Sequence, residues 1–94
     1  MYNDLDPLLG SQVRLAVVSV LMTVKQAEFN HLMEVAQTTQ GNLSAQLKKL
    51  SEGEYILIEK TFKGSYPLTT CSITEKGKAA FEVYVETIKK YLHL

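Results

Sequence analysis

Residues 40–52 hold most of the side chains in this sequence that could bind another molecule. At about 100° per residue, a helix here places Leu43, Leu47 and Leu50 on one side. The rest of its surface carries small, amide, hydroxyl or ammonium groups, contributed by Gln40, Gly41, Asn42, Ser44, Ala45, Lys48 and Lys49. Amides can hydrogen-bond to base edges, above all those of adenine, and lysines neutralise phosphates. This surface therefore fits close approach to a nucleic-acid duplex.

A second polar cluster follows at the predicted tip of a β-hairpin. It consists of Lys60, Lys63, Gly64, Ser65 and Tyr66. Lysines, a hydroxyl and a flexible glycine at such a tip can lie along a DNA backbone or enter a minor groove. Each of these polar residues alone is more typical of a solvated turn or surface. The prediction therefore depends on the helix and the hairpin occurring together and in this order.

The elements that position these groups follow from the spacing of apolar residues and from the residues that flank them. Apolar positions at helical spacing predict three helices before the hairpin, at about residues 11–23, 28–37 and 40–52. Ser11 and Thr39 are suitable N-caps, and Gly53 ends the third helix. Ahead of them, Asp6 followed by Pro7 predicts a short helical turn.

The pattern then changes to one typical of strands. Residues 55–62 and 68–73 predict a β-hairpin with a loop of about five residues at 63–67. Thr74 is a suitable N-cap for a last helix that runs to about Leu92. The predicted fold class is mainly α with a small β-hairpin. Its sections, within one domain over 1–94, are terminal helices at about 5–24 and 75–92, a helix-turn-helix at about 28–52 and the hairpin at 55–73.

Length and composition narrow the classes of protein that fit. The chain has 94 residues, enough for one small core, and its ten basic residues balance ten acidic ones. A globally basic coat is therefore excluded, and any nucleic-acid binding must come from a local patch. A single cysteine rules out a disulfide scaffold. The start of the chain does not resemble a signal peptide and no apolar run is long enough to span a bilayer, so we expect a cytoplasmic protein that binds no membrane.

The residues that could suggest catalysis, metal binding or redox chemistry lack the partner residues that such chemistry requires. His31, His93 and Cys71 do not have the spacing of metal ligands. Cys71 falls on the core side of its predicted strand, with no basic neighbour to activate it, which favours a buried inert thiol. No nucleophile elbow, phosphate-binding loop or carboxylate pair is present. We therefore expect no enzyme activity, no metal and no cofactor.

The first and last predicted helices have more apolar surface than one small domain can bury. The first is apolar on all sides and the last has a broad apolar stripe, which predicts that a second copy of the chain covers them. The residues expected at this dimer interface are Val13, Val17, Val18, Phe81, Tyr84, Val85, Ile88, Tyr91 and Leu92. Tyr84 and Tyr91 could instead line a pocket for a small effector, but packing of the interface is the favoured interpretation.

Several motifs recur with the spacing of a known family. They are the run Gly41 to Leu50 (GNLSAQLKKL), the run Gly53 to Ile56 (GEYI), Lys60 to Gly64 (KTFKG), Leu68 to Thr70 (LTT) and Ile73 to Phe81 (ITEKGKAAF). From residue 14 to about residue 91 the chain resembles winged-helix transcription regulators of the MarR/ArsR type, most of all the small stand-alone winged-helix DNA-binding group. The resemblance implies a repressor-like dimer that assembles through its first and last helices. It also implies a recognition helix at 40–50 and a wing at 60–68.

The sequence departs from that family in its charges. Wings of this type usually carry several basic residues, where this chain has Ser65, Tyr66 and Leu68. Its one arginine, Arg14, lies in the first helix, away from the proposed DNA-binding surface. We therefore expect modest affinity per monomer, which a dimer would increase.

Two functions lead from the sequence, well ahead of a third, an enzyme or ligand sensor that uses a pocket at the dimer interface. The first is a sequence-specific regulator of transcription, with the third helix in the major groove and the wing on the flanking backbone or minor groove. Two recognition helices about 34 Å apart would then contact a pseudo-palindromic duplex. The second is a winged-helix protein–protein interaction module that does not bind DNA, which the zero net charge permits.

Overall fold

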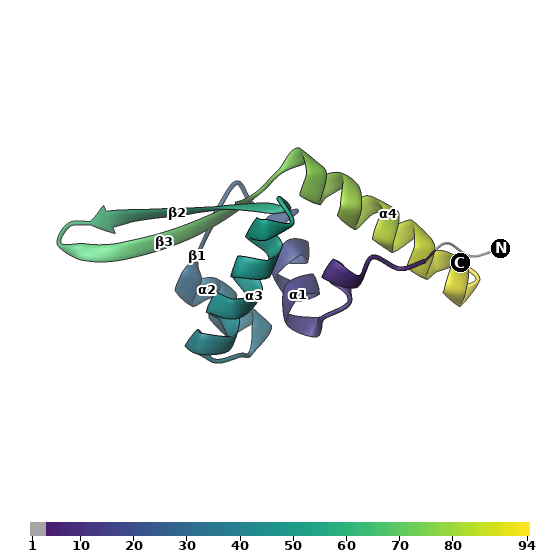
Figure 1. The fold of residues 1–94 in the computed structure, drawn as a ribbon, viewed down its shortest axis with the longest axis horizontal. Helices are drawn as coiled ribbons and strands as arrows, with labels where there is room; N and C mark the ends of the chain where they lie inside the picture. The colour runs from purple at the N-terminus through teal and green to yellow at the C-terminus, as the bar shows by residue number, and fades with distance from the viewer. Residues whose placement is uncertain (1–3) are drawn as a thin grey trace.

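The computed structural model describes residues 4–94 as an elongated molecule with extents of 53 × 25 × 21 Å. The first three residues of the predicted domain lie outside this part. The elements are η1 (Pro7–Leu9), α1 (Gln12–Leu21), β1 (Ala27–Glu28), α2 (Phe29–Ala36), α3 (Gln40–Glu52), β2 (Ile56–Lys63), β3 (Tyr66–Ile73) and α4 (Glu75–Leu92). The hairpin of β2 and β3 projects from one end of a body formed by η1 and α1–α3, and α4 projects from the other end (Figure 1). The predicted fold class is confirmed.

Side-chain caps start the helices where the sequence predicts. The hydroxyl oxygens of Ser11, Thr39 and Thr74 accept hydrogen bonds from backbone N–H groups three residues later, at 3.3, 3.2 and 2.9 Å. Asp6 does the same for η1, where its carboxylate accepts from the N–H of Leu8 at 2.9 Å. Each of these bonds satisfies a donor that the helix itself leaves without a partner.

The core lies between the helices of the body and the base of the hairpin. Leu43, Leu47 and Leu50 of α3 are buried there, which confirms the predicted inward stripe. Cys71 is buried as well, on the side of β3 that faces the helices. The other fully buried apolar residues are Leu9, Val17, Val18, Leu21, Leu32 and Ile56. Because α3 is anchored along one side, its opposite side is left to solvent.

Two of the predicted interface residues belong to this core. Val17 and Val18 are 1% and 0% exposed within a single chain, so the prediction that they contact a second copy is wrong. Helix α1 contacts α2, α3 and β3 on one side and α4 on another. Its apolar character all round therefore reflects mainly its central position in its own chain.

The hairpin is tighter than the sequence suggests. Its loop has two residues rather than five, because Lys63 pairs directly with Tyr66. Gly64 has a φ of 65°, a positive angle of the kind that the first loop position of a type II′ turn requires and that glycine adopts without strain. Pro67 is tolerated in β3 because β1 pairs only with residues 70 and 71, so β3 has a free edge at that point.

A short third strand was not predicted. Ala27 and Glu28 form β1, which pairs antiparallel with Cys71 and Thr70, so the sheet order is β1–β3–β2. Glu28 therefore lies in a strand and not in the second helix, which begins at Phe29. A strand of two residues is too short to show alternation in the sequence.

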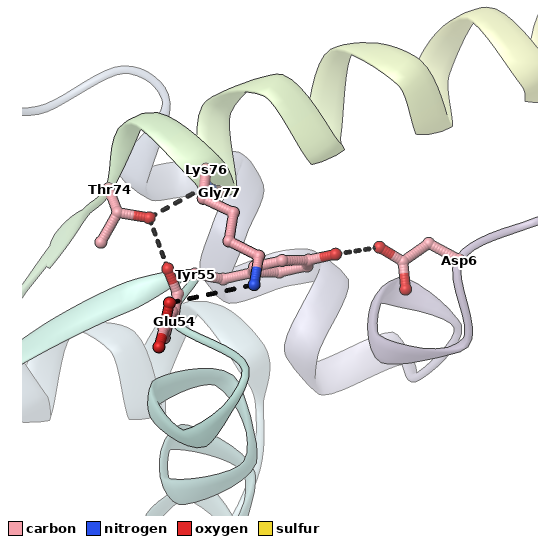
Figure 2. A network of polar contacts seen from close by, with 6 residues as sticks. All are labelled: Asp6, Glu54, Tyr55, Thr74, Lys76 and Gly77. Atoms are coloured by element: carbon pink, nitrogen blue, oxygen red, sulfur yellow. Dashed lines mark hydrogen bonds and ion pairs between the residues drawn. The ribbon is translucent and has the colours of Figure 1, made fainter.

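A network of polar contacts fixes the base of α4 to the rest of the chain (Figure 2). The hydroxyl of Tyr55 donates a hydrogen bond to the carboxylate of Asp6, and Thr74 donates to the carbonyl of Glu54 at 2.7 Å. Gly77 packs so closely on the backbone of Tyr55 that an added Cβ would overlap the carbonyl oxygen of Tyr55. Burial, together with the hydrogen bond and the charge of Asp6, raises the pKa of Tyr55 to about 12.

We call this network the α4 joint. It consists of Asp6, Glu54, Tyr55, Thr74, Lys76 and Gly77. Lys76 completes it, since its ammonium group lies 4.0 Å from the carboxylate of Glu54 and 5.9 Å from the centre of the Tyr55 ring. No helix formed by residues 4–94 is long and apolar enough to cross a membrane.

Candidate nucleic-acid interface

The solvent side of α3 presents the residues that the sequence placed there. Gln40, Gly41, Asn42, Ser44, Ala45, Lys48 and Lys49 are all exposed. Thr39 is exposed too, but its hydroxyl oxygen is occupied as the N-cap of the helix. No side chain lies near Gly41, since an added Cβ there would meet nothing within 4 Å. The small residues therefore leave the backbone of α3 open to a close neighbour.

A groove of about 470 Å³ separates α3 from the hairpin. Gln40, Ser44 and Lys48 line it from α3, while Lys60 and Thr69 line it from the hairpin. Glu52, at the end of α3, also reaches the groove and adds one negative charge. The groove thus brings Lys48 and Lys60 to one concave surface. This juxtaposition could not be derived from the sequence, because it depends on the angle between helix and sheet.

The register of the hairpin divides the predicted wing residues between its two faces. Lys60 is paired with Thr69, and both lie on the groove side. Lys63 and Tyr66 form a pair of the opposite parity, at the tip of the hairpin. The structure therefore unites Lys60 with α3 and leaves Lys63, Ser65 and Tyr66 at the far end of the projecting hairpin (Figure 1).

Phe62 is a residue that the sequence analysis missed. It pairs with Pro67 and shares the parity of Lys60, so it lies on the groove side of the hairpin next to the tip. Its side chain is 71% exposed. Phe62 ends the strand that the sequence predicts, but only the tertiary structure shows that this face of the strand lines the groove.

Asn42 is held by contacts within its own chain. Its amide donates to the hydroxyl of Thr38 at 2.7 Å, and its carbonyl oxygen accepts from Gln46 at 3.1 Å. Gln46 in turn accepts a hydrogen bond from Arg14, whose Nε donates to the carbonyl of Leu8 at 2.7 Å. This chain of bonds ties Arg14 to η1 and to Gln46 of α3. It also occupies both ends of the Asn42 amide.

The other polar groups of the site make no such bonds. The side chains of Gln40, Ser44, Lys48 and Lys49 have no hydrogen bond or ion pair with any residue in the range 4–94, and the same holds for Lys60 and Lys63. Their donors and charges are therefore directed only to solvent. A ligand that supplies acceptors and negative charge can bind them without first breaking internal contacts.

The structure offers little support for metal or redox chemistry. No group of three or more His, Cys, Asp or Glu side chains within residues 4–94 could hold a metal ion. Burial raises the pKa of the Cys71 thiol to about 11, and a thiol that stays protonated at neutral pH is a weak nucleophile.

A second surface feature lies between α1 and α4. Phe81, Tyr84, Val85 and Ile88 line an apolar groove of about 460 Å³ together with Leu15 and Ala16 of α1. Of the remaining predicted interface residues, Val13 is half-buried, and Tyr91 and Leu92 are exposed at the far end of α4.

Comparisons with known proteins converge on one family. Residues 13–92 match the family described as the winged helix DNA-binding domain. An uncharacterized protein of Methanocaldococcus jannaschii is 35% identical over 79 residues, which are 84% of this chain and 86% of that protein.

Solved structures share the fold. A transcriptional regulator homologue from Pyrococcus horikoshii is 24% identical and has a TM-score of 0.85 over 94% of this chain and 87% of that chain. A cysteine-to-serine mutant of MarR from E. coli, solved in complex with operator DNA, is 18% identical, with a TM-score of 0.70 over 87% of this chain and 56% of that chain.

Proposed function

Because the chain belongs to the winged helix DNA-binding domain family, we propose that it binds duplex DNA in a sequence-specific way as a regulator of transcription. Family membership and the shared fold confirm the resemblance that the sequence motifs indicate. In the proposed complex α3 lies in the major groove, and the hairpin acts as a wing on the flanking backbone or minor groove. MarR, which shares the fold, was solved with operator DNA, and this supports the proposal.

The observation that carries the proposal is the concave surface between α3 and the hairpin. Gln40, Ser44 and Lys48 line one wall and Lys60 the other, and none of these side chains has a hydrogen bond or ion pair with the part of the chain that the structure describes. A phosphate backbone that passes through this groove would meet an ammonium group on each side. The amide of Gln40 is then the group best placed to contact a base edge.

The proposed functional unit is a homodimer. The groove between α1 and α4 is apolar and runs along both helices. The same surface of a second copy could therefore pack against it. Two copies related by a twofold axis would place their α3 helices about one DNA turn, roughly 34 Å, apart, which suits a pseudo-palindromic operator. We propose that such a dimer acts as a repressor and that the protein is cytoplasmic.

Enrichment of duplexes from a random pool tests the proposal directly. The wild-type protein is expected to enrich one sequence, and its affinity for that duplex is expected to fall steeply as salt rises. Replacing both Lys48 and Lys49 with alanine should weaken binding to all sequences and lower the salt slope by about one for each lysine that contacts a phosphate. Lys90→Ala, which removes one positive charge from the last turn of α4, is the control and should leave the slope unchanged.

The alternative is a protein–protein interaction module that uses the same surface. The zero net charge of the chain is the observation that favours it. A protein that is not retained on a heparin or DNA column at low salt, and that enriches no duplex, would support this alternative and contradict the DNA-binding proposal.

A further inference from the structure

We propose that Phe62 is an apolar wedge that enters the minor groove of the bound duplex and opens or bends a base step there. The inference rests on the proposed function, because it needs a duplex in the groove between α3 and the hairpin. It adds a second means of selecting sequence, through the deformability of the DNA rather than through hydrogen bonds.

The position of Phe62 continues the concave surface described above. Lys60 and Phe62 are separated by one residue of β2, so their side chains project from the same face of the hairpin. Their partners on β3, Thr69 and Pro67, are on that face too. A duplex whose backbone passes Lys60 therefore meets the Phe62 ring and the Pro67 ring next, toward the tip.

The fold itself gives Phe62 no packing role. Its side chain is 71% exposed and belongs neither to the core nor to the half-buried residues that pack against the core. The two-residue loop holds the ring on a paired strand rather than on a flexible turn. A ring on such a rigid support loses little conformational freedom when it is inserted.

The chemistry of the tip favours an apolar contact over a cationic one. The arginine that narrow minor grooves attract is absent from the hairpin, and Arg14 is bound to the body. Phenylalanine and proline are side chains that proteins insert between base steps from the minor groove. Insertion costs least at pyrimidine–purine steps such as TA and CA/TG, which unstack easily. The wing is thus expected to select such a step beside the site contacted by α3, while Lys60 binds the adjacent phosphate.

The test compares three variants on the duplex that wild-type protein enriches from a random pool. Phe62→Ala removes the wedge, Phe62→Leu keeps an apolar one, and Leu57→Ala is the control. Leu57 is on the same strand and 58% exposed, but it has the opposite parity and lies at the base of the hairpin. Affinity is measured as a function of salt, and DNA bending is measured by energy transfer between dyes at the duplex ends.

We expect Phe62→Ala to lower the affinity about tenfold and to reduce the bend, because about one buried side chain is lost. The salt slope should not change, since no charge is removed, whereas Lys60→Ala should lower it by about one. Phe62→Leu should retain most of the affinity and the bend, and Leu57→Ala should match wild type. Duplexes enriched by Phe62→Ala should lose the pyrimidine–purine step at the flank and keep the sequence under α3.

Two outcomes would overturn the inference and remain distinct from failure of the proposed function. If Phe62→Ala binds and bends the duplex as wild type does, the ring does not enter the DNA, and a contact with a protein partner becomes the interpretation of its exposure. If Phe62→Ala and Leu57→Ala lose affinity equally, the loss is not specific to this face. Failure of the proposed function would appear earlier, as absence of any duplex enriched by the wild-type protein. Unchanged thermal unfolding of Phe62→Ala confirms that the variant is folded.

Discussion

The hairpin and α4 project from opposite ends of the same small body (Figure 1). Both carry exposed apolar side chains. On the hairpin these side chains are separate, because Leu57 and Tyr66 share one face but lie at opposite ends of it, and Phe62 lies on the other face. On α4 the half-buried side chains of Phe81, Tyr84, Val85 and Ile88 form a continuous groove with α1. Single apolar side chains on a polar hairpin that carries lysines suit contact with the grooves and backbone of a duplex. A continuous apolar surface suits another surface of the same kind.

The two arms also differ in how the body holds them. The hairpin is paired along its full length, from Ile56 with Ile73 to Lys63 with Tyr66. Helix α4 depends on the α4 joint at its first turns and on a narrow contact with α1. The base of the hairpin is also buried in the core, at Ile56 and Cys71, whereas α4 needs its joint, and in our proposal a second copy, to keep its position.

The largest effect is expected where the joint holds α4. In Gly77→Ala the new Cβ would overlap the carbonyl oxygen of Tyr55, a backbone atom that cannot move alone. We expect the free energy of unfolding to fall by about 3 kcal/mol, measured by urea denaturation. Gly41→Ala is the control, because its Cβ meets nothing within 4 Å, and it should change stability by no more than about 1 kcal/mol. Equal stability of the two variants would mean that α4 does not depend on the joint.

A charge in the groove between α1 and α4 should disrupt the proposed dimer and leave the hairpin and α3 intact. Ile88→Asp places a carboxylate on the apolar surface and is expected to give monomers in sedimentation equilibrium. Apparent affinity for the enriched duplex should then fall about a hundredfold, because the second α3 is no longer tethered to the first. Glu82→Ala, an exposed change on the same helix, should leave both properties unchanged. A dimer that survives Ile88→Asp would contradict the proposed role of this groove.

Base preference should depend on Gln40 more than on Asn42. The amide of Asn42 is already bound to Thr38 and Gln46, whereas that of Gln40 makes no hydrogen bond within residues 4–94. Gln40→Ala is expected to reduce discrimination at one base pair about tenfold, measured with single-base variants of the enriched duplex. Asn42→Ala should reduce it less. A larger loss for Asn42→Ala would show that its internal bonds break when DNA binds.

The smallest effect concerns the pH dependence of the joint. The pKa of Tyr55 is raised from 10.0 to about 12, so the folded protein holds this proton more tightly than the unfolded chain. The resulting stability is complete below pH 10 and is lost as the pH rises toward 12. Tyr55→Phe should therefore lose less stability than wild type over this range, as measured by urea denaturation at a series of pH values. Identical pH profiles would show that the Tyr55 phenol does not contribute.

Residual alkaline loss in Tyr55→Phe is expected from Cys71. Burial raises the pKa of its thiol from 9.0 to about 11, so its contribution disappears over an overlapping range. The same stable proton predicts slow reaction of Cys71 with thiol reagents in the folded protein.

The sequence predicted whatever depends on neighbours along the chain. The caps at Ser11, Thr39 and Thr74 and the buried leucines of α3 follow from local spacing, and all were confirmed. Features that depend on pairing between distant segments were not predictable in this way. The loop proved to have two residues instead of five, with Gly64 at positive φ, and only the register of the two strands showed which face each wing residue occupies.

The site shows the same division. Which residues of α3 face solvent followed from helical periodicity, but the internal bonds of Asn42 involve Gln46 and, through it, Arg14 from another helix. Val17 and Val18 had the composition of an interface and proved to be core, because α1 is surrounded on several sides. Periodicity reports that a face is apolar, and only tertiary structure reports what covers it.

The α4 joint fixes only the first turns of the last helix, next to Tyr55, so a small change there moves the far end of the helix. Helix α4 has 18 residues and is therefore about 27 Å long, so a tilt of about 5° at the base displaces its far end by roughly 2 Å. In the proposed symmetric dimer both α4 helices would tilt together, and the distance between the two α3 helices would change by a comparable amount. In the proposed dimer, the contacts that join Asp6, Tyr55 and Gly77 would therefore set the distance between the two α3 helices, which has to equal about one turn of the duplex.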